Sequence, residues 1–166
     1  MVVVEKPGTG ELRICLDAPE LNSCILRENT QIPTKEEIQA TMGKAKIFSR
    51  IDASAAFWHL RLDEVSSDLC TFNTPFGRYQ FLVMPYGIRS ASEIFHRELR
   101  SLFEGMPGVT NIHDDIIIHS ETVESHIQIL KKVLEVCRRK GLRLNRKKCE
   151  IGLSQVKFFG ELLTDE

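Results

Sequence analysis

Apolar and polar positions recur along this chain with two different periods. Alternation with a period of two is typical of a half-buried strand, whereas apolar residues three or four apart are typical of a helix face. Residues 2–16 fit a hairpin that turns at residues 7–10, and residues 69–83 fit a second hairpin that turns at residues 74–77. Further strands are predicted at residues 47–51, 109–112, 116–118, 142–144 and 156–159.

Three segments have the apolar spacing and the terminal residues of helices. The first begins at a capping box, Thr34 with Glu37, and ends at Gly43. The second begins at Ser90 with Glu93 and stops before residues 105–107, and the third spans residues 123–140. Hairpins followed by helices that return to strands predict an α+β fold, with an antiparallel sheet and helices on one face.

Composition narrows the classes of protein that fit. The chain has 166 residues with 42% hydrophobic content, which suits a single domain. Lysine and arginine number 22 against 23 acids, and the net charge of −1 excludes a polybasic protein but not a local basic groove. No apolar run approaches the roughly 20 residues of a membrane span. Five cysteines without a C-x-x-C pair indicate reduced thiols, so we expect an intracellular protein without a membrane partner, either cytoplasmic or nuclear.

Three carboxylates stand at the ends of predicted strands. Asp114 and Asp115 lie between two apolar strands, and Asp52 ends the strand at residues 47–51. Taken singly, the pair suits a tight turn and Asp52 suits a helix N-cap. Taken together, three such acids form a hard oxygen site for magnesium or manganese, and two such ions can support an in-line phosphoryl displacement.

Basic residues that could bind a phosphoryl donor occur in two places. Lys6 and Arg13 bracket the first turn, seven residues apart across the hairpin, and Lys147-Lys148 follows the predicted strand at residues 142–144. Lysine and arginine both bind phosphate, although each pair also fits a solvated surface. The sequence therefore predicts candidate contacts to phosphate without deciding between these readings.

Five stretches, taken in order, resemble the reverse transcriptase of gypsy-type long-terminal-repeat retrotransposons. They cover nearly the whole chain, and their common register carries the resemblance. The stretches are residues 2–7 with 12–17 and 21–22, residues 48–52 with 56–57 and 59–62, residues 81–87 with Ala91 and Phe95, residues 111–116, and residues 141–145 with 148–149 and 156–160.

The resemblance implies roles for residues at matching positions. Asp52, Asp114 and Asp115 match the catalytic, metal-binding aspartates, and Lys148 matches a lysine thought to protonate the leaving pyrophosphate. The remaining matches concern the incoming deoxynucleoside triphosphate and the primer. They are Lys6 and Arg13 on the triphosphate, Phe57 beneath the deoxyribose, Tyr86 beside the nucleotide, and Phe158, Phe159 and Gly160 at the primer terminus.

The same resemblance implies an architecture and an activity. The fold is expected to be a right-hand polymerase palm with partial fingers, the fingers at about residues 1–46 and 63–83 and the palm elsewhere. The chain is expected to begin inside the fingers and to end at the primer-holding turn, while the intact polyprotein adds a thumb and a ribonuclease H region. The expected reaction is RNA-directed DNA synthesis on an RNA or DNA template-primer, with two Mg²⁺ ions, or Mn²⁺, as cofactors. The sequence does not indicate an oligomeric state.

Several positions depart from the family pattern and keep a second interpretation open. Ile112 replaces an aromatic residue, His113 a smaller one, Glu20 a cation and Ser92 a proline. Such changes suit a catalytically inactive retrotransposon remnant that acts as a weak nucleic-acid-binding or interaction module. A metal phosphatase or nuclease would favour histidines near the acids, where only His113 and His119 lie close in sequence.

Overall fold

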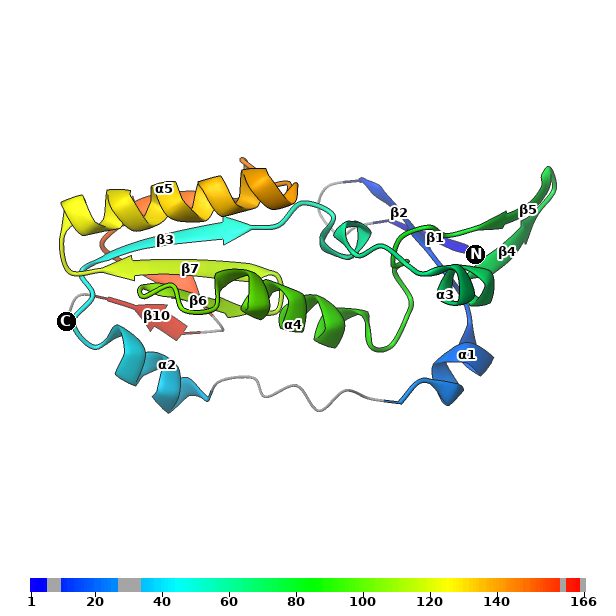
Figure 1. Ribbon diagram of the computed structural model, residues 1–166, viewed down its shortest axis with the longest axis horizontal. Helices are drawn as coiled ribbons and strands as arrows, with labels where there is room; N and C mark the ends of the chain where they lie inside the picture. Colours follow the sequence, from blue (N-terminus) through cyan, green and yellow to red (C-terminus); the bar gives the residue numbers. More distant parts are fainter. Residues whose placement is uncertain (6–9, 27–33, 159–160, 165–166) are drawn as a thin grey trace. The chain divides into compact units, whose positions relative to one another are not determined.

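The computed structural model describes residues 1–5, 10–26, 34–158 and 161–164, and it divides the chain into two compact units (Figure 1). Unit 1 comprises residues 1–29 and 55–95, and unit 2 comprises residues 30–54 and 96–166. These bounds differ from the expected division into fingers and palm, because residues 30–46 belong to unit 2 and residues 55–62 and 84–95 to unit 1. The assignment of fingers and palm stays a prediction.

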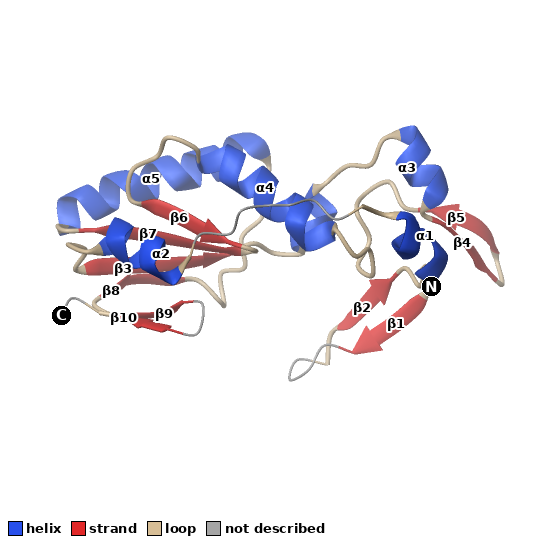
Figure 2. Cartoon of the chain, turned by 90° about the horizontal axis from the view of Figure 1, so that it is seen from below, coloured by secondary structure: helices blue, strands red, loops and turns tan. Residues whose placement is uncertain are grey.

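Unit 2 is built on a four-stranded antiparallel sheet, in which the strands lie in the order β6-β7-β3-β8 (Figure 2). Two neighbouring strands are joined by a two-residue turn, since Ile112 of β6 pairs with Asp115 of β7. A separate hairpin of β9 and β10 follows β8. The bounds are β3 Ile47–Asp52, β6 Val109–Ile112, β7 Asp115–Ser120, β8 Glu150–Leu153, β9 Val156–Phe158 and β10 Glu161–Leu163.

The two faces of this sheet carry different helices. Cross-strand partners share a face, so Ser49 and Ile51 lie on the same face as Ile118 and Ile116. On that face α4 (Ala91–Phe103) and α5 (Val123–Lys140) are attached by hydrogen bonds from their buried histidines. On the other face α2 (Lys35–Met42) packs its Ile38 and Met42 into one cluster with Phe48, Ile112 and Ile117. Figure 1 shows α5 above β3 and β7 and α2 below them.

Burial on both faces explains the apolar run in β7. Ile116, Ile117 and Ile118 are fully buried, although alternate residues point to opposite faces. Burying each isoleucine contributes about 1.5–3 kcal/mol to the free energy of unfolding. The second covered face, provided by α2, goes beyond the predicted helices on one face, while the antiparallel α+β architecture is confirmed.

The helix ends of unit 2 follow the predicted signals. Thr34 and Glu37 form both hydrogen bonds of a capping box at the start of α2. Thr122 caps α5, whose last turn carries three basic residues, and Gly141 ends it with a φ of 71°. Both helices therefore begin and end within a residue of their predicted limits.

Unit 1 consists of two hairpins and short helices around a smaller core. Strands β1 and β2 pair with each other, as do β4 and β5, and neither pair joins a larger sheet. Leu16, Cys70, Met84, Ile88 and Ala91 are the buried residues of its hydrophobic cluster. The bounds are β1 Val2–Glu5, β2 Leu12–Cys15, α1 Pro19–Cys24, the 3-10 helix η1 Ala56–His59, α3 Glu64–Leu69, β4 Thr71–Thr74 and β5 Gly77–Gln80.

The end of β2 meets the segment before α4 through a tight backbone contact. The Leu16 N–H donates a hydrogen bond of 2.7 Å to the Tyr86 carbonyl, and Cys15 and Tyr86 form a parallel bridge. Gly87 has a φ of 101°, and a Cβ atom there would overlap the Leu16 carbonyl. Only glycine fits both the backbone conformation and the space.

Five elements were not predicted from the pattern: α1, α3, η1, β8 and β10. Helix α3, capped by Asp63, occupies residues 64–69, so the strand expected at 69–72 begins only at Thr71. Helix α1 lies where no periodicity was visible, and β8 replaces a predicted loop, while residues 142–144 contribute only a bridge between Leu144 and Ala53. No helix in the described part of the chain is both long and apolar enough to cross a bilayer.

Candidate active site

Two of the three predicted aspartates face each other at one end of the unit 2 sheet. Asp52 is the last residue of β3 and Asp115 the first of β7, and they are paired in register. Cross-strand partners project to the same face, here the face opposite α4 and α5. Asp52 is buried and Asp115 half-buried, so the sheet fixes both carboxylates rather than leaving them in solvent.

Asp114 occupies the turn between β6 and β7, and this turn is held from outside the hairpin. The Ala53 N–H lies 3.5 Å from the Asp114 carbonyl, and the His113 N–H donates to Nδ1 of His96 over 3.2 Å. His113 has a φ of 53°, a conformation that costs a non-glycine residue about 1–2 kcal/mol. Among the described residues other than glycine, only His113 and Ala55 have positive φ, and each lies within three residues of a predicted catalytic aspartate.

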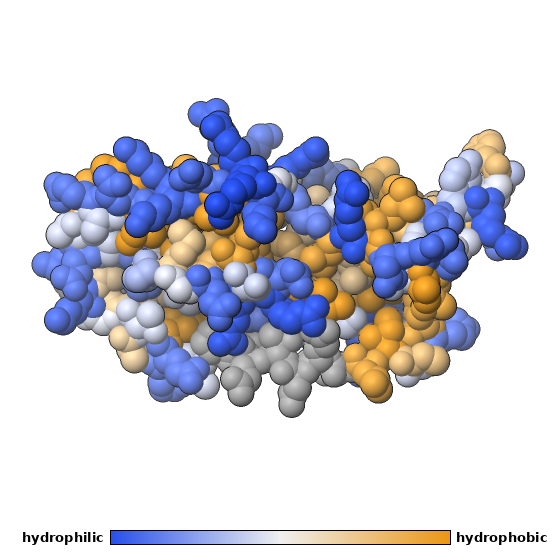
Figure 3. Space-filling model, in the orientation of Figure 1, coloured by the Kyte–Doolittle hydropathy of each residue, from blue (hydrophilic) through white to orange (hydrophobic). Residues whose placement is uncertain are grey.

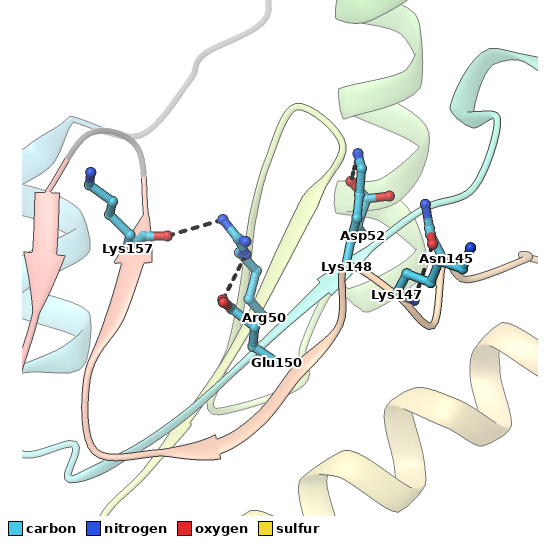
Figure 4. Close-up of polar contacts among 7 residues, drawn as sticks. All are labelled: Arg50, Asp52, Asn145, Lys147, Lys148, Glu150 and Lys157. Carbon is cyan, nitrogen blue, oxygen red and sulfur yellow. Dashed lines mark hydrogen bonds and ion pairs between the residues drawn. The ribbon is translucent and has the colours of Figure 1, made fainter. Parts of the chain in front are cut away.

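Lys148 reaches the same carboxylates from the loop before β8. Its Nζ lies 2.8 Å from Oδ2 of Asp52, and the Asp52 carbonyl accepts a hydrogen bond from the Asn145 N–H (Figure 4). The Asn145 side chain in turn accepts from the Lys147 N–H, which shapes the loop. The backbone thus places Lys148 against Asp52, although the side chains of both Lys147 and Lys148 are exposed.

Arg50 lies on the same sheet face as Asp52, two residues earlier in β3. Its Nε is 3.2 Å from Oε2 of Glu150, and its Nη1 donates to the Lys157 carbonyl of β9 (Figure 4). The sequence analysis did not single out Arg50, although its position on the aspartate face follows from the period of two. Arg50 adds a second cation to the neighbourhood of the carboxylates.

The electrostatics of the site favour a bound cation. Burial raises the pKa of the Asp115 carboxyl, and the negative charges of Asp114 and Asp52 raise it further, against opposing effects of Arg50 and Lys148. The hydrogen bond to Asp52 raises the pKa of Lys148. A cation among the aspartates would relieve the repulsion that disfavours ionised Asp115.

The donor set suits a hard divalent ion, but the site is not preassembled. Three aspartate carboxylates are the oxygen ligands that Mg²⁺ and Mn²⁺ prefer. Within the described residues, however, no three His, Cys, Asp or Glu side chains form a group ready to hold a metal ion, and Lys148 already engages Asp52. Loading a metal would therefore require small side-chain movements and a weakening of that ion pair.

The residues predicted to contact a nucleotide gather in unit 1. The Arg13 guanidinium lies 4.3 Å from the centre of the Tyr86 ring, a cation–π contact. Phe57 on η1 lies 4.9 Å from Tyr86 and 6.3 Å from Phe95 between ring centres. Trp58, which the sequence analysis did not single out, lies 6.1 Å from Tyr86 and is half exposed. Three predicted residues are thus brought together: Arg13, Phe57 and Tyr86.

The remaining predicted residues are only partly covered by the structure. Lys6, Phe159 and Gly160 lie outside the described residues. Phe158 is described only by its backbone, as the end of β9 paired with Glu161 of β10. Their proposed contacts to triphosphate and primer stay predictions.

Sequence comparison decides the family. Residues 4–162 match the family described as "Reverse transcriptase (RNA-dependent DNA polymerase)". The chain belongs to the reverse transcriptase family. An uncharacterised protein of Caenorhabditis elegans is 33% identical over 96% of this chain, and the Pol polyprotein from transposon 297 of Drosophila melanogaster is 30% identical over 99%. The chain covers only 13% and 16% of these two relatives, so it corresponds to a small part of each.

Solved reverse transcriptases have the same fold. The foamy viral protease-reverse transcriptase in complex with double-stranded DNA matches 98% of this chain with a TM-score of 0.87 and 26% identity, over 29% of its own length. The same enzyme in complex with an RNA/DNA hybrid matches with a TM-score of 0.84 and 26% identity, over 22% of its length. The prediction of a reverse transcriptase fold is confirmed, while the narrower gypsy-type assignment stays a prediction.

Proposed function

We propose that this reverse transcriptase chain catalyses RNA-directed DNA synthesis, adding deoxynucleotides to a primer 3′-hydroxyl on an RNA or DNA template. The observation that carries the proposal is the carboxylate pair of Asp52 and Asp115, held in register at a sheet end with Lys148 against it. Membership of the family supplies the reaction class, and the buried acids supply the chemistry that it requires.

The aspartates are the proposed ligands of two divalent ions. When bound, Mg²⁺ or Mn²⁺ would lower the pKa of the primer hydroxyl and neutralise charge on the triphosphate. Asp52 and Asp115 hold their carboxylates on one face, and Asp114 adds a third from the turn. Burial and the neighbouring acids raise the pKa of Asp115, and a bound cation would lower it.

Lys148 is the proposed proton donor to the leaving group. The primer 3′-hydroxyl releases its proton to solvent as its oxygen forms a bond to the α-phosphorus, the bond from the α-phosphorus to the bridging oxygen breaks, and the departing pyrophosphate takes up a proton from Lys148. Lys148 is protonated at neutral pH, as an ordinary lysine is, and the hydrogen bond to Asp52 raises its pKa further. The loop from Asn145 keeps its ammonium near the carboxylates without burying it completely.

The substrate contacts are proposed to lie in unit 1. Arg13, with Lys6, would bind the triphosphate, Tyr86 would lie beside the nucleotide, and Phe57 would exclude a 2′-hydroxyl. The packing of Phe57 between Tyr86 and Phe95 supports this role, because a ring held on two sides cannot yield to a larger sugar. Residues 158–160 are the proposed contact to the primer terminus. We also propose that the protein is intracellular, in line with its five free cysteines.

Primer extension tests the proposal directly. The chain is given a DNA primer on a polyribonucleotide template, with Mg²⁺, Mn²⁺ or a chelator, and Asp52→Asn is compared with Asp63→Asn. Asp63 caps the exposed start of α3, where asparagine caps equally well. We expect metal-dependent extension that Asp52→Asn abolishes and Asp63→Asn retains. Extension that persists with the chelator or in Asp52→Asn would contradict the aspartate assignment.

One observation favours a second candidate, a catalytically inactive nucleic-acid-binding module. The Lys148–Asp52 ion pair and the absence of a preassembled three-ligand group among the described residues are compatible with a site that no longer loads metal. The same experiment separates the two. Template-primer binding without extension in either metal, in the 166 residues and in a longer chain with the downstream region, would establish the inactive module.

A further inference from the structure

The ring of His96 contacts the aspartate turn from the helix beneath it. His96 lies in the middle of α4 and is 1% exposed. Its Nδ1 accepts a hydrogen bond of 3.2 Å from the His113 backbone N–H, in the turn that carries Asp114. Asn111 supports the same arrangement, because its amide nitrogen lies 3.3 Å from Nδ1 and 3.4 Å from the His96 carbonyl.

The direction of this hydrogen bond is fixed by its donor. A backbone N–H can only donate, so Nδ1 of His96 must be unprotonated and the ring proton must lie on Nε2. Among the described residues Nε2 has no hydrogen-bond partner. The polar contacts of the ring therefore serve β6 and the aspartate turn.

The turn needs such support because of its backbone. His113 has a φ of 53° and precedes Asp114, which precedes the first residue of β7. A second hydrogen bond to the turn from outside its hairpin runs from the Ala53 N–H to the Asp114 carbonyl, over 3.5 Å. Without the His96 contact, the left-handed His113 would lose the acceptor of its backbone N–H, and the Asp114 side chain would reorient with the backbone.

We propose that His96 is a positioning residue for the metal-binding carboxylates: its Nδ1 holds the His113 N–H and thereby orients Asp114 and Asp115 toward a divalent cation. This inference rests on the proposed function. His96 touches neither substrate nor metal and acts only through the turn.

Three variants test the inference. His96→Phe keeps a ring but removes the hydrogen-bond acceptor. His96→Asn keeps an acceptor, because the asparagine Oδ1 is bonded to Cγ, as Nδ1 is in histidine. His126→Phe is the matched control, since His126 of α5 is also buried and is hydrogen-bonded to Ser49 of β3 and Ser120 of β7, away from the aspartate turn. Three readouts are taken on each folded protein: hydrogen exchange of the His113 amide, the Mn²⁺ dissociation constant from water-proton relaxation, and kcat and KM for primer extension.

The expected pattern differs among the variants. His96→Phe should expose the His113 amide, weaken Mn²⁺ binding several-fold and lower kcat about tenfold to hundredfold, with little change in KM for the nucleotide. His96→Asn should restore the amide protection, the Mn²⁺ affinity and kcat. His126→Phe should not reduce them in the folded fraction, and only the amount of folded protein should fall. A His113 amide that exchanges freely in the unmodified chain overturns the inference even if His96→Phe does not fold.

Failure of the inference and failure of the proposed function remain distinguishable. If the unmodified chain extends primers and His96→Phe matches His126→Phe in kcat and Mn²⁺ affinity, positioning by His96 is wrong. If the unmodified chain does not extend primers while amide exchange and Mn²⁺ affinity change as expected, the proposed polymerase activity is wrong and the orientation of the carboxylates by His96 stands.

Discussion

The two units of this chain differ in how far they bury their apolar side chains. Unit 2 buries a central strand on both faces and attaches its helices through buried histidines. Unit 1 consists of two-stranded hairpins, and most of the exposed large apolar side chains belong to it, including Val3, Leu12 and Phe76. In Figure 3 the orange, hydrophobic surface is most extensive over the elements of unit 1, whereas the outer side of α5 is largely blue.

This difference in packing suits the two units to different roles, metal binding in unit 2 and nucleotide selection in unit 1. Carboxylates that must share a metal need fixed positions, and β3 and β7 provide them because both are paired and covered. The proposed contacts to a nucleotide tolerate more adjustment, and their residues lie on short elements, a hairpin and the 3-10 helix η1. Changes in unit 2 should therefore affect catalysis and stability strongly, and changes in unit 1 should affect selectivity.

The largest effect is expected at the carboxylates. Asp115→Asn should lower primer extension by about a thousandfold, since it removes a proposed metal ligand. The same change should raise the unfolding midpoint at pH 7 in a chelator, because the pKa of Asp115 is raised in the fold and its charged form opposes folding. This gain should disappear as the pH falls below about 3.8, where both states bind the proton. A drop in midpoint at pH 7 would contradict the repulsion argued here.

The second-largest effect is expected on stability, where truncating an apolar side chain should cost more free energy of unfolding in unit 2 than in unit 1. Ile117→Ala removes a fully buried side chain of unit 2 and should cost about 2–5 kcal/mol in urea unfolding. Val3→Ala on exposed β1 should cost less than about 0.5 kcal/mol. Equal costs for the two changes would remove the contrast between a packed scaffold and open hairpins.

Selectivity should respond to a change in unit 1. Phe57→Ala should raise ribonucleotide incorporation relative to deoxyribonucleotide incorporation by about tenfold or more, because the ring that excludes the 2′-hydroxyl is gone. Phe72→Ala is the control, since Phe72 is also half-buried and packs on Phe81 in the same unit. Both should cost a similar free energy of unfolding, about 1–3 kcal/mol. An unchanged sugar preference in Phe57→Ala would make Phe57 a core residue only.

Acid should weaken unit 2 through its buried histidines. Burial lowers the pKa values of His96, His119 and His126, so the folded protein keeps them neutral. The stability that these neutral histidines provide is complete above their unfolded pKa of about 6.5, and it is lost as the pH falls toward their lowered pKa values in the folded protein. Thermal unfolding between pH 7 and 5 should show this loss, and His126→Gln should reduce the slope because it removes one titrating ring.

The smallest expected effect is local strain beside η1. Ala55 has a φ of 51°, so Ala55→Gly should stabilise the fold by up to about 1 kcal/mol. Ala56→Gly, one residue later in η1 and without a positive φ, should destabilise it by about 0.5–1 kcal/mol. Chemical unfolding of the two variants should give opposite signs.

Sequence patterns identified what local physics determines. The capping box at Thr34 and the stop at Gly141 act within a few residues, and both were predicted. The apolar spacing of α5 identified its buried face only in part, since Val133 and Cys137 are buried but Val123 and Ile127 are exposed, and His126 is buried instead. His126 carries no apolar signal in the sequence. Its burial depends on hydrogen bonds to Ser49 and Ser120, which lie 77 and 6 residues away along the chain.

The candidate site was predictable in identity but not in arrangement. Asp52, Asp114, Asp115 and Lys148 were found by resemblance, and the pairing of Asp52 with Asp115 requires the register of β3 and β7. The engagement of Asp52 by Lys148 depends on a loop whose course no periodicity describes. Arg50 and His96 were missed because each acts through a neighbour on another element.

Gly87 gives the chain one position with no freedom to vary. Its backbone passes so close to the Leu16 carbonyl that every side chain beyond hydrogen would push β2 away from the Tyr86 segment. In a library of all single substitutions, position 87 should therefore be depleted of every alternative, alanine included, even though it is exposed and carries no chemistry. A residue that looks dispensable by exposure would rank among the least replaceable in the chain.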